Sequence, residues 1–249
     1  EKRINQLFDY SVFVSRDEAD LFSMLYPEAE NLSVIPNGVD HEYFHPSKAF
    51  GDQYAVSEIQ HPALLFTGAM DYHANVDGVI WFCKEILPLI KKEIPEVRFY
   101  IVGSNPSPKV QALSTDDGVE VTGFVEDIRP YYQEADLCVI PLRLARGVQN
   151  KVLEAMAMEK PVVTTKKALY GIRATPEEHT LVADDPLTFA SLVLGLLRDG
   201  SRARQLGHHA REFVRDNYDW PSNIKKLEEI LLSRDNHNNP VNPVQNLGG

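Results

Sequence analysis

The chain has 249 residues, of which 43% are hydrophobic and 24% are charged, a balance typical of an ordinary folded protein and not of a disordered or collagen-like one. Its formal net charge of -11 opposes binding to a polyanion, so no nucleic-acid partner is expected. The chain has only two cysteines, so a disulfide framework is not expected. No apolar run approaches the ~20 residues of a membrane helix, and we expect a cytoplasmic location.

The N-terminal part predicts a small βα unit that is joined to the rest of the chain by an irregular segment. Ser15 followed by Glu18 forms a capping box, which marks the start of a helix. The predicted elements are a strand at residues 10–14, a helix at 17–25 and a strand at 32–35. Turn-forming and polar residues then favour a connection over residues 37–60, which separates residues 1–36 from the remainder.

From residue 61 onwards, continuous apolar strands alternate with amphipathic helices. The strands are predicted at residues 63–67, 98–102, 119–122, 137–140 and 162–165. The helices between them are predicted at residues 76–93, 109–113, 127–134 and 151–158, with a kink at Pro88. This alternation is typical of an α/β fold, with a doubly wound, Rossmann-like parallel sheet that is covered by helices on both faces.

The C-terminal part predicts three further helices and a tail. The helices are expected at residues 186–197, 201–218 and 221–232. We therefore expect one domain over residues 61–217 and a separate helix over residues 218–234. The segment 235–249 is rich in Asn and Pro and is expected to be disordered.

Ligands of doubly wound sheets bind beyond the carboxyl ends of the strands, and three of the predicted strands are followed there by Gly68, Gly103 and Gly123. The patterns G-x-G-x-x-G and G-x-x-x-x-G-K-[ST] are both missing from the sequence, which argues against a standard NAD site and against a P-loop. The histidines show no metal-ligand spacing with other histidines, cysteines or carboxylates, so no metal site is predicted.

The most informative segment follows the predicted strand at residues 137–140. Arg146 and Gly147 form a flexible loop, and a helix opens at Asn150 or Lys151. A helix N-terminus and two cations that are aimed at one point make a natural diphosphate site. Glu154 lies one turn along the same helix, where its carboxylate can accept hydrogen bonds from a ribose diol.

At these residues the sequence resembles the retaining GT-B glycosyltransferases that are often called family 4. Residues 153–163 match the family's helix pattern LEAMA-x-G-x-PVV, with Glu159 in place of the usual Gly. The loop Arg-Gly-x-x-Asn-Lys before this helix is most similar to that of sugar transferases from bacterial exopolysaccharide clusters. The resemblance accounts for nearly all of residues 11–232, and its other motifs are Ile35-Pro36-Asn37-Gly38-Val39-Asp40, Phe66-Thr67-Gly68 with Asn75, Gly123-Phe124-Val125 and Ala135-Asp136.

The resemblance implies the donor lobe of a two-lobed enzyme, in which residues 1–36 are the end of the acceptor lobe. Such an enzyme transfers a hexosyl group from a UDP- or GDP-sugar to a glycan or lipid-linked acceptor, needs no metal, and can contact a membrane peripherally through the acceptor lobe. Arg146 and Lys151 are then the expected catalytic cations that stabilise the departing diphosphate. The expected donor-binding residues are Gly68, Asn75, Phe124, Val125, Gly147, Asn150 and Glu154.

One departure from the family pattern leaves alternatives open. The family commonly carries a second glutamate eight positions before the one that matches Glu154, and this chain has Arg146 there. The role in sugar recognition and the stereochemical outcome therefore do not carry over. The alternatives are a nucleotide-sugar-binding module without transferase activity and a nucleotide-sugar epimerase of the same fold. Asn75 has two compatible readings, as the cap of the following helix and as a residue that faces the ligand.

Overall fold

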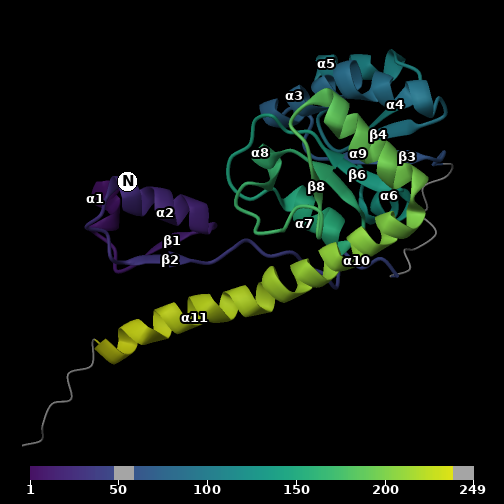
Figure 1. Ribbon diagram of the computed structural model, residues 1–249. Helices are drawn as coiled ribbons and strands as arrows, with labels where there is room; N and C mark the ends of the chain where they lie inside the picture. Colours follow the sequence, from purple (N-terminus) through teal and green to yellow (C-terminus); the bar gives the residue numbers. More distant parts are fainter. Residues whose placement is uncertain (48–58, 238–249) are drawn as a thin grey trace, which may run out of the picture.

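The computed structural model describes residues 1–47 and 59–237. A small N-terminal unit and a large α/β domain are joined by an extended segment, and a long C-terminal helix accompanies that segment (Figure 1). In the small unit two strands pair in parallel, and Glu18 N donates to the hydroxyl of Ser15 as the capping box predicts (3.3 Å). Its elements are α1 (Lys2–Asn5), β1 (Ser11–Phe13), α2 (Arg16–Leu25) and β2 (Leu32–Val34).

The large domain is built on a six-stranded sheet in which every strand pairing is parallel. The spatial order is β5-β4-β3-β6-β7-β8, so the chain builds outward from β3 and then returns to build outward from β6 on the other side. All residues of β3 and β6 are buried, because helices cover both faces of the sheet. The predicted fold class is therefore confirmed. The strands are β3 (Ala63–Thr67), β4 (Arg98–Val102), β5 (Val119–Gly123), β6 (Leu137–Ile140), β7 (Val162–Thr164) and β8 (Leu181–Val182).

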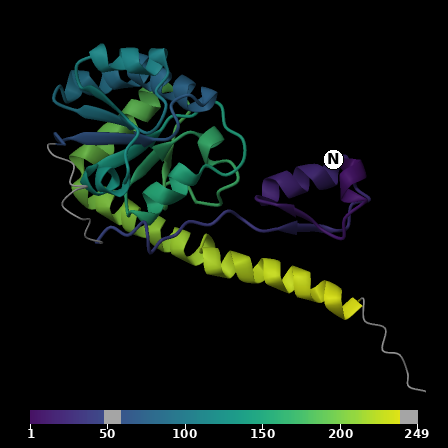
Figure 2. The same ribbon diagram turned by 180° about the vertical axis from the view of Figure 1, so that it is seen from behind.

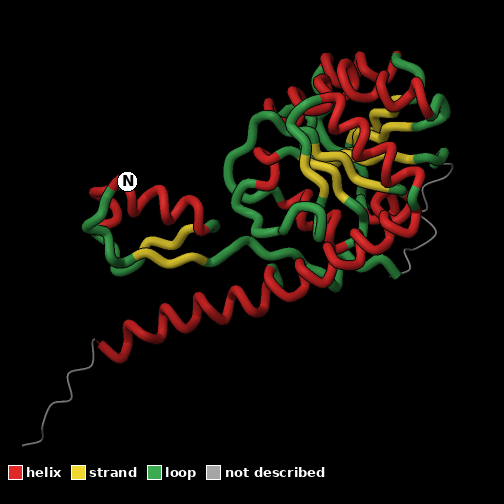
Figure 3. The backbone as a smooth tube through the Cα atoms, in the orientation of Figure 1, coloured by secondary structure: helices red, strands yellow, loops and turns green. Residues whose placement is uncertain are grey.

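The helices form layers above and below the sheet (Figure 3). Among these helices, α9 packs against α4, and α10 packs against α7. Within the described ranges, no helix is long and apolar enough to cross a membrane. The helices are α3 (His73–Trp81), a π-helix (Phe82–Ile86), α4 (Leu87–Glu93), α5 (Pro108–Gln111), a 3₁₀-helix (Ala112–Thr115), α6 (Arg129–Glu134), α7 (Asn150–Ala157), α8 (Lys166–Leu169), α9 (Pro186–Arg198), α10 (Gly200–Asn217) and α11 (Trp220–His237).

Pro88, which is expected to kink the helix that follows β3, lies directly after a π-helical segment. The wider turn of that segment is closed by Leu87, whose backbone N–H donates to the carbonyl of Phe82. Proline has no N–H and its ring pushes the carbonyl of the preceding turn away, and a π-turn absorbs such a break without ending the helix. The helix consequently runs from α3 through α4.

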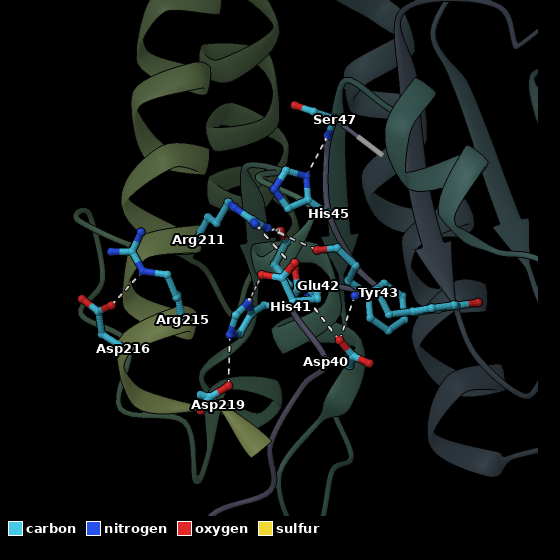
Figure 4. Close-up of polar contacts among 12 residues, drawn as sticks. Asp40, His41, Glu42, Tyr43, His45, Ser47, Arg211, Arg215, Asp216 and Asp219 are labelled. Atoms are coloured by element: carbon cyan, nitrogen blue, oxygen red, sulfur yellow. Dashed lines mark hydrogen bonds and ion pairs between the residues drawn. The ribbon is translucent and has the colours of Figure 1, made fainter. Parts of the chain in front are cut away.

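The segment that connects the two units is fastened to the end of α10 and the start of α11 (Figure 4). Val39 N donates to the carbonyl of Tyr218 (2.8 Å), and His41 Nε2 lies 3.0 Å from Asp219 Oδ1. The guanidinium of Arg211 on α10 donates to the backbone carbonyls of His41 and Phe44 in the connecting segment and to that of Ala157 at the end of α7. The predicted connection at residues 37–60 is thus an ordered segment that is bound to the large domain up to residue 47. Residues 48–58 lie outside the described part of the chain.

α11 leaves the domain and runs past the N-terminal unit (Figure 2). Asp219 caps its first turn, because Oδ2 accepts hydrogen bonds from the backbone N–H and the hydroxyl of Ser222 (3.0 and 2.9 Å). The helix continues to His237, so residues 235–237 are helical and do not belong to a disordered tail. An existing helix can extend into such a segment because each added residue gains one hydrogen bond without a new nucleation step. The composition of residues 235–237 alone does not indicate that a helix precedes them. The rest of the predicted tail lies outside the described residues.

The turn after α7 carries the one mismatch in the family's helix pattern. Glu159 N donates to Met156 O (2.9 Å) and Lys160 N donates to Ala155 O (3.0 Å), which is the Schellman arrangement of a helix end. Glu159 has φ 58°, in the left-handed region where a side chain is strained and glycine is not. The left-handed backbone conformation at this position therefore explains why the family pattern has glycine there.

We expect Glu159→Gly to raise the free energy of unfolding by about 1 kcal/mol, because it removes left-handed strain. Chemical denaturation monitored by circular dichroism measures this change. Glu159→Ala is the control: it keeps the strain and removes the solvent-exposed charge that contacts His208 (3.4 Å), so its stability should stay within about 0.5 kcal/mol of the unsubstituted protein. Equal stability of the two variants would contradict the strain argument.

Candidate functional site

A polar pocket of the domain lies where the strand order reverses. The crossovers on the two sides of β3 and β6 leave the sheet in opposite directions, which opens a crevice beyond the carboxyl ends of these strands. The pocket has a volume of about 310 Å³, within the ~300–1,000 Å³ range of small-molecule sites. It is lined by Thr67, Gly68, Ala69, Tyr72, Asn75, Ile128, Val148, Gln149, Asn150, Lys151 and Glu154.

A larger hollow, of about 460 Å³, lies in the N-terminal unit. Most of its lining is apolar, and its charged side chains are the carboxylates of Glu1 and Glu18. A phosphate would therefore meet charge of the wrong sign there. The crevice in the large domain is the better candidate for an anionic ligand.

The N-terminus of α7 opens into this crevice. The residue before the helix, Gln149, makes no side-chain cap, and its side-chain amide donates instead to the carbonyls of Arg146 and Gly147 (3.0 and 3.3 Å). The first backbone N–H groups of α7 are thus not occupied by a capping side chain, and the helix dipole places partial positive charge beside Asn150. This geometry suits an anion at the pocket.

Lys151 carries the main positive charge of the pocket. Its Nζ donates to Asn75 Oδ1 (2.5 Å) and lies 4.3 Å from the centre of the Phe66 ring. The amide of Asn75 is held in that orientation because Nδ2 donates to the carbonyl of Ala69 (2.8 Å). Burial lowers the pKa of Lys151 to about 7, against a partly compensating attraction to Glu154. An incoming anion would therefore stabilise the charged form of this amine.

Gly68 leaves room for the contact between Lys151 and Asn75. A Cβ atom at Gly68 would lie 2.7 Å from Asn75 Nδ2 and 2.8 Å from Lys151 Nζ, and the residue has φ +150°. Asn75 does not cap the helix, because α3 begins at His73 and Asn75 lies inside the first turn. The capping interpretation of Asn75 is therefore wrong, and its side chain serves the pocket.

Glu154 lies one turn along α7 from Lys151 and is held by a buried tyrosine. The hydroxyl of Tyr132 donates to Glu154 Oε2 (3.2 Å), and it lies 2.8 Å from Thr67 Oγ1. Burial raises the pKa of the Glu154 carboxyl, while the hydrogen bond from Tyr132 and the charge of Lys151 lower it. The site thus contains a desolvated carboxylate that still has acceptor capacity for a ligand hydroxyl.

Five of the predicted site residues come together in the pocket: Gly68, Asn75, Asn150, Lys151 and Glu154. The other four do not line it. Arg146 lies exposed in the loop before α7, next to Gly147, which adopts a left-handed φ of 64°. Phe124 is 75% exposed and Val125 packs against the core, both just after β5 at the same edge of the sheet. Their roles toward a ligand stay predictions.

Five residues with polar side chains at or beside the pocket are not predicted from the sequence: Asn37, Thr67, Tyr72, Tyr132 and Gln149. Asn37 reaches the site from the connecting segment, since its Nδ2 donates to Asn150 Oδ1 (3.2 Å). Thr67 is the polar residue at the end of the otherwise apolar strand β3, and this is the signal that could have identified it. Tyr132 lies among polar residues in α6, so the sequence gives no such signal for it. Among the described residues, no group of three or more His, Cys, Asp or Glu could hold a metal ion.

Comparison with known proteins assigns the family. Residues 61–199 match the model of the family described as Glycosyl transferases group 1. The chain belongs to this family. It is 25% identical over 227 residues to an uncharacterized 44.6 kDa protein in the cps region of Klebsiella pneumoniae, a match that covers 88% of the chain and 55% of the relative. It is 27% identical over 256 residues to a GDP-mannose-dependent α-(1-6)-phosphatidylinositol monomannoside mannosyltransferase of Mycolicibacterium smegmatis, with 94% and 64% covered.

Solved structures of glycosyltransferases share the fold. A glycosyltransferase from Rickettsia africae superposes with a TM-score of 0.72 at 16% identity, covering 92% of this chain and 66% of that one. The Anabaena protein HepE in complex with UDP and glucose has a TM-score of 0.70 at 16% identity, covering 92% and 64%. The predicted GT-B-like fold is confirmed, and so is the prediction that the chain belongs to a glycosyltransferase family. The chain spans between 55% and 64% of the length of the curated relatives it matches.

Proposed function

We propose that this chain is the donor-binding part of a glycosyltransferase that moves a hexosyl group from a UDP- or GDP-sugar to a glycan or lipid-linked acceptor in polysaccharide biosynthesis. The observation that carries the proposal is the position of Lys151, a desolvated amine at the N-terminus of α7 in the crevice of a doubly wound sheet. A relative that uses GDP-mannose and a structural neighbour in complex with UDP support a nucleotide diphosphate donor.

The pocket matches the parts of such a donor in order. The diphosphate lies against the first turn of α7 and the amine of Lys151, while the ribose hydroxyls donate to the carboxylate of Glu154. Gly68 lets the ligand approach the end of β3 closely, because no Cβ intervenes. The base lies toward Phe124 and Val125 after β5, at the same edge of the sheet.

Catalysis in this proposal is electrostatic. As the bond between the sugar and the phosphate loosens, negative charge builds on the departing diphosphate, and the amine of Lys151 stabilises that charge within a partly dry pocket. Arg146 adds its guanidinium if the exposed loop before α7 folds over the bound donor. Neutralisation by these cations and by the helix N-terminus makes a metal unnecessary.

The acceptor is bound by a second lobe, to which the N-terminal unit at residues 1–36 contributes α1, β1, α2 and β2. We place the enzyme in the cytoplasm, where nucleotide sugars are made, with peripheral contact to a membrane through the acceptor lobe. A lipid-linked acceptor would require such contact. The named activity of the mycobacterial relative, on phosphatidylinositol monomannoside, supports this class of acceptor.

The test is calorimetric titration of the chain with UDP, GDP, ADP and the corresponding nucleotide sugars. We expect one nucleotide to bind with a dissociation constant in the micromolar range, and Glu154→Ala to weaken that binding about tenfold through loss of charged hydrogen bonds. Glu134→Ala, at an exposed carboxylate at the end of α6, is the control and should leave the affinity unchanged. Failure of every nucleotide to bind the folded chain would overturn the proposal.

A further inference from the structure

Tyr132 is a polar residue placed where only apolar residues would be expected. It belongs to α6, its side chain is 1% exposed, and its ring packs edge-on against Phe44 of the connecting segment with centroids 6.2 Å apart. A phenylalanine would fill the same volume without a hydroxyl to satisfy. A buried hydroxyl without partners would be unfavourable, so its two contacts deserve a functional explanation.

The hydroxyl of Tyr132 joins two residues that both line the pocket. Because an ionised carboxylate can only accept, Tyr132 must donate its single hydrogen to Glu154 Oε2 (3.2 Å). Its oxygen is then free to accept from Thr67 Oγ1 (2.8 Å). The three groups form one directed chain that runs from the end of β3 to the carboxylate, and bonds in such a chain strengthen one another.

This chain acts on the conformation of Glu154. A glutamate side chain has three rotatable bonds, and holding it in one rotamer before the ligand arrives removes an ordering step from binding. Tyr132 supplies that restraint from a rigid position, because its own ring is fixed by burial between α6 and the sheet. The carboxylate is thereby presented to the pocket in a defined orientation.

The chain also acts on the charge of Glu154. Burial raises the pKa of this carboxyl, and the hydrogen bond from Tyr132 opposes the rise. A protonated carboxyl would have lost part of the acceptor strength that a diol requires. Tyr132 therefore favours both the geometry and the ionisation state that a ribose needs.

We propose that Tyr132 is the positioning residue that gives this site its selectivity for ribose over deoxyribose, acting through Glu154 and supported by Thr67. The inference rests on the proposed function, because it assumes that the ribose of the donor meets Glu154. Tyr132 itself does not contact the ligand. Its contribution is confined to the part of the affinity that depends on the ribose hydroxyls.

The experiment compares Tyr132→Phe with the unsubstituted chain by titration with UDP and GDP and with their 2′,3′-dideoxy analogues. We expect Tyr132→Phe to weaken binding of the ribonucleotide about tenfold and to change binding of the dideoxy analogue less than about twofold. In the Glu154→Ala background the same substitution should have no further effect, because the two residues act as one unit.

The neighbouring tyrosine gives a matched control. Tyr131→Phe removes the same atom one residue earlier on α6, where the side chain is half-buried and does not line the pocket, so it should leave both affinities unchanged. Thr67→Ser keeps the hydroxyl and should preserve selectivity, whereas Thr67→Val should reduce it. Loss of affinity for both nucleotides by the same factor in Tyr132→Phe would indicate a merely structural role and overturn the inference.

A second measurement decides the inference independently of the ligand. Isotope-edited infrared spectroscopy of the Glu154 carboxyl in the ligand-free chain should show a higher pKa in Tyr132→Phe than in the unsubstituted protein, because a hydrogen bond to the charged form has been removed. An unchanged pKa would overturn the inference. If neither UDP nor GDP binds the unsubstituted chain, the proposed function fails, and the carboxyl titration still decides whether Tyr132 controls Glu154.

Discussion

Replacing Lys151 with methionine is expected to weaken the binding of nucleoside diphosphates by about 100-fold or more, which corresponds to ~3 kcal/mol of charge-assisted contact in a desolvated pocket. Methionine fills a similar volume without charge, so the pocket should keep its shape. Calorimetric titration with UDP and GDP measures the loss. Lys84→Met removes an equal charge from an exposed position on the π-helix, and it should leave the affinity unchanged.

The same substitution is expected to change how stability depends on pH. Burial lowers the pKa of Lys151 from 10.5 to about 7, so between these values the unfolded chain binds more protons than the folded one. The charged amine is therefore unfavourable to folding below pH 7, and this penalty is relieved as the pH rises toward 10. Between about pH 7 and pH 10, the free energy of unfolding of the unsubstituted protein should therefore rise by about 1–3 kcal/mol relative to that of Lys151→Met. This value allows for the solvent that reaches the amine through the pocket.

Ligand binding should reverse this shift. A diphosphate near Lys151 favours the protonated amine, so binding at pH 7 to 8 should take up a fraction of a proton and should weaken as the pH rises above 7. Titrations in two buffers of different ionisation enthalpy detect the uptake. Proton-neutral binding by the unsubstituted protein, or equal pH dependence in Lys151→Met, would show that this amine does not meet the diphosphate.

The sheet could be predicted from the sequence because its cause is local. Strands that are buried on both faces are continuous apolar runs, and the bounds predicted for β3, β4 and β6 match the structure. β8 has two residues, Leu181–Val182, and shows no alternation that a reader of the sequence could detect. The start of α3 was missed for a similar reason, because Tyr72 precedes it without a capping side chain.

The site could be predicted only in part, because its chemistry depends on contacts between distant segments. Lys151 and Glu154 follow from their place at the start of a helix after a strand, which is a local pattern. The low pKa of Lys151 arises from burial near Phe66 and Asn75, and the orientation of Glu154 arises from Tyr132. All three partners lie more than 20 residues away in the chain, so no spacing in the sequence reveals them.

Adding a methyl group to Gly103, the glycine that follows β4, is expected to disturb this edge of the sheet more than the same change at the other glycines here. A Cβ at Gly103 would lie 1.8 Å from the carbonyl oxygen of Gly68, and Gly103 has φ +146°. This carbonyl is backbone and cannot swing away as a side chain would. The turn at Gly68 is fixed in turn by its N–H, which donates to Val102 O (3.0 Å).

Gly103→Ala is therefore expected to lower the free energy of unfolding by about 3 kcal/mol or more, as the sum of steric overlap and backbone strain. Gly123→Ala separates the two causes, because Gly123 ends the neighbouring strand with φ +74° but would place its Cβ in open space. It should lower the stability by only about 1–2 kcal/mol. Urea denaturation of both variants measures the difference, and similar losses would show that the close approach of Gly103 to Gly68 does not constrain the site. Where Gly103→Ala still folds, the displaced Gly68 turn should also disturb the contact between Asn75 and Lys151 and weaken nucleotide binding.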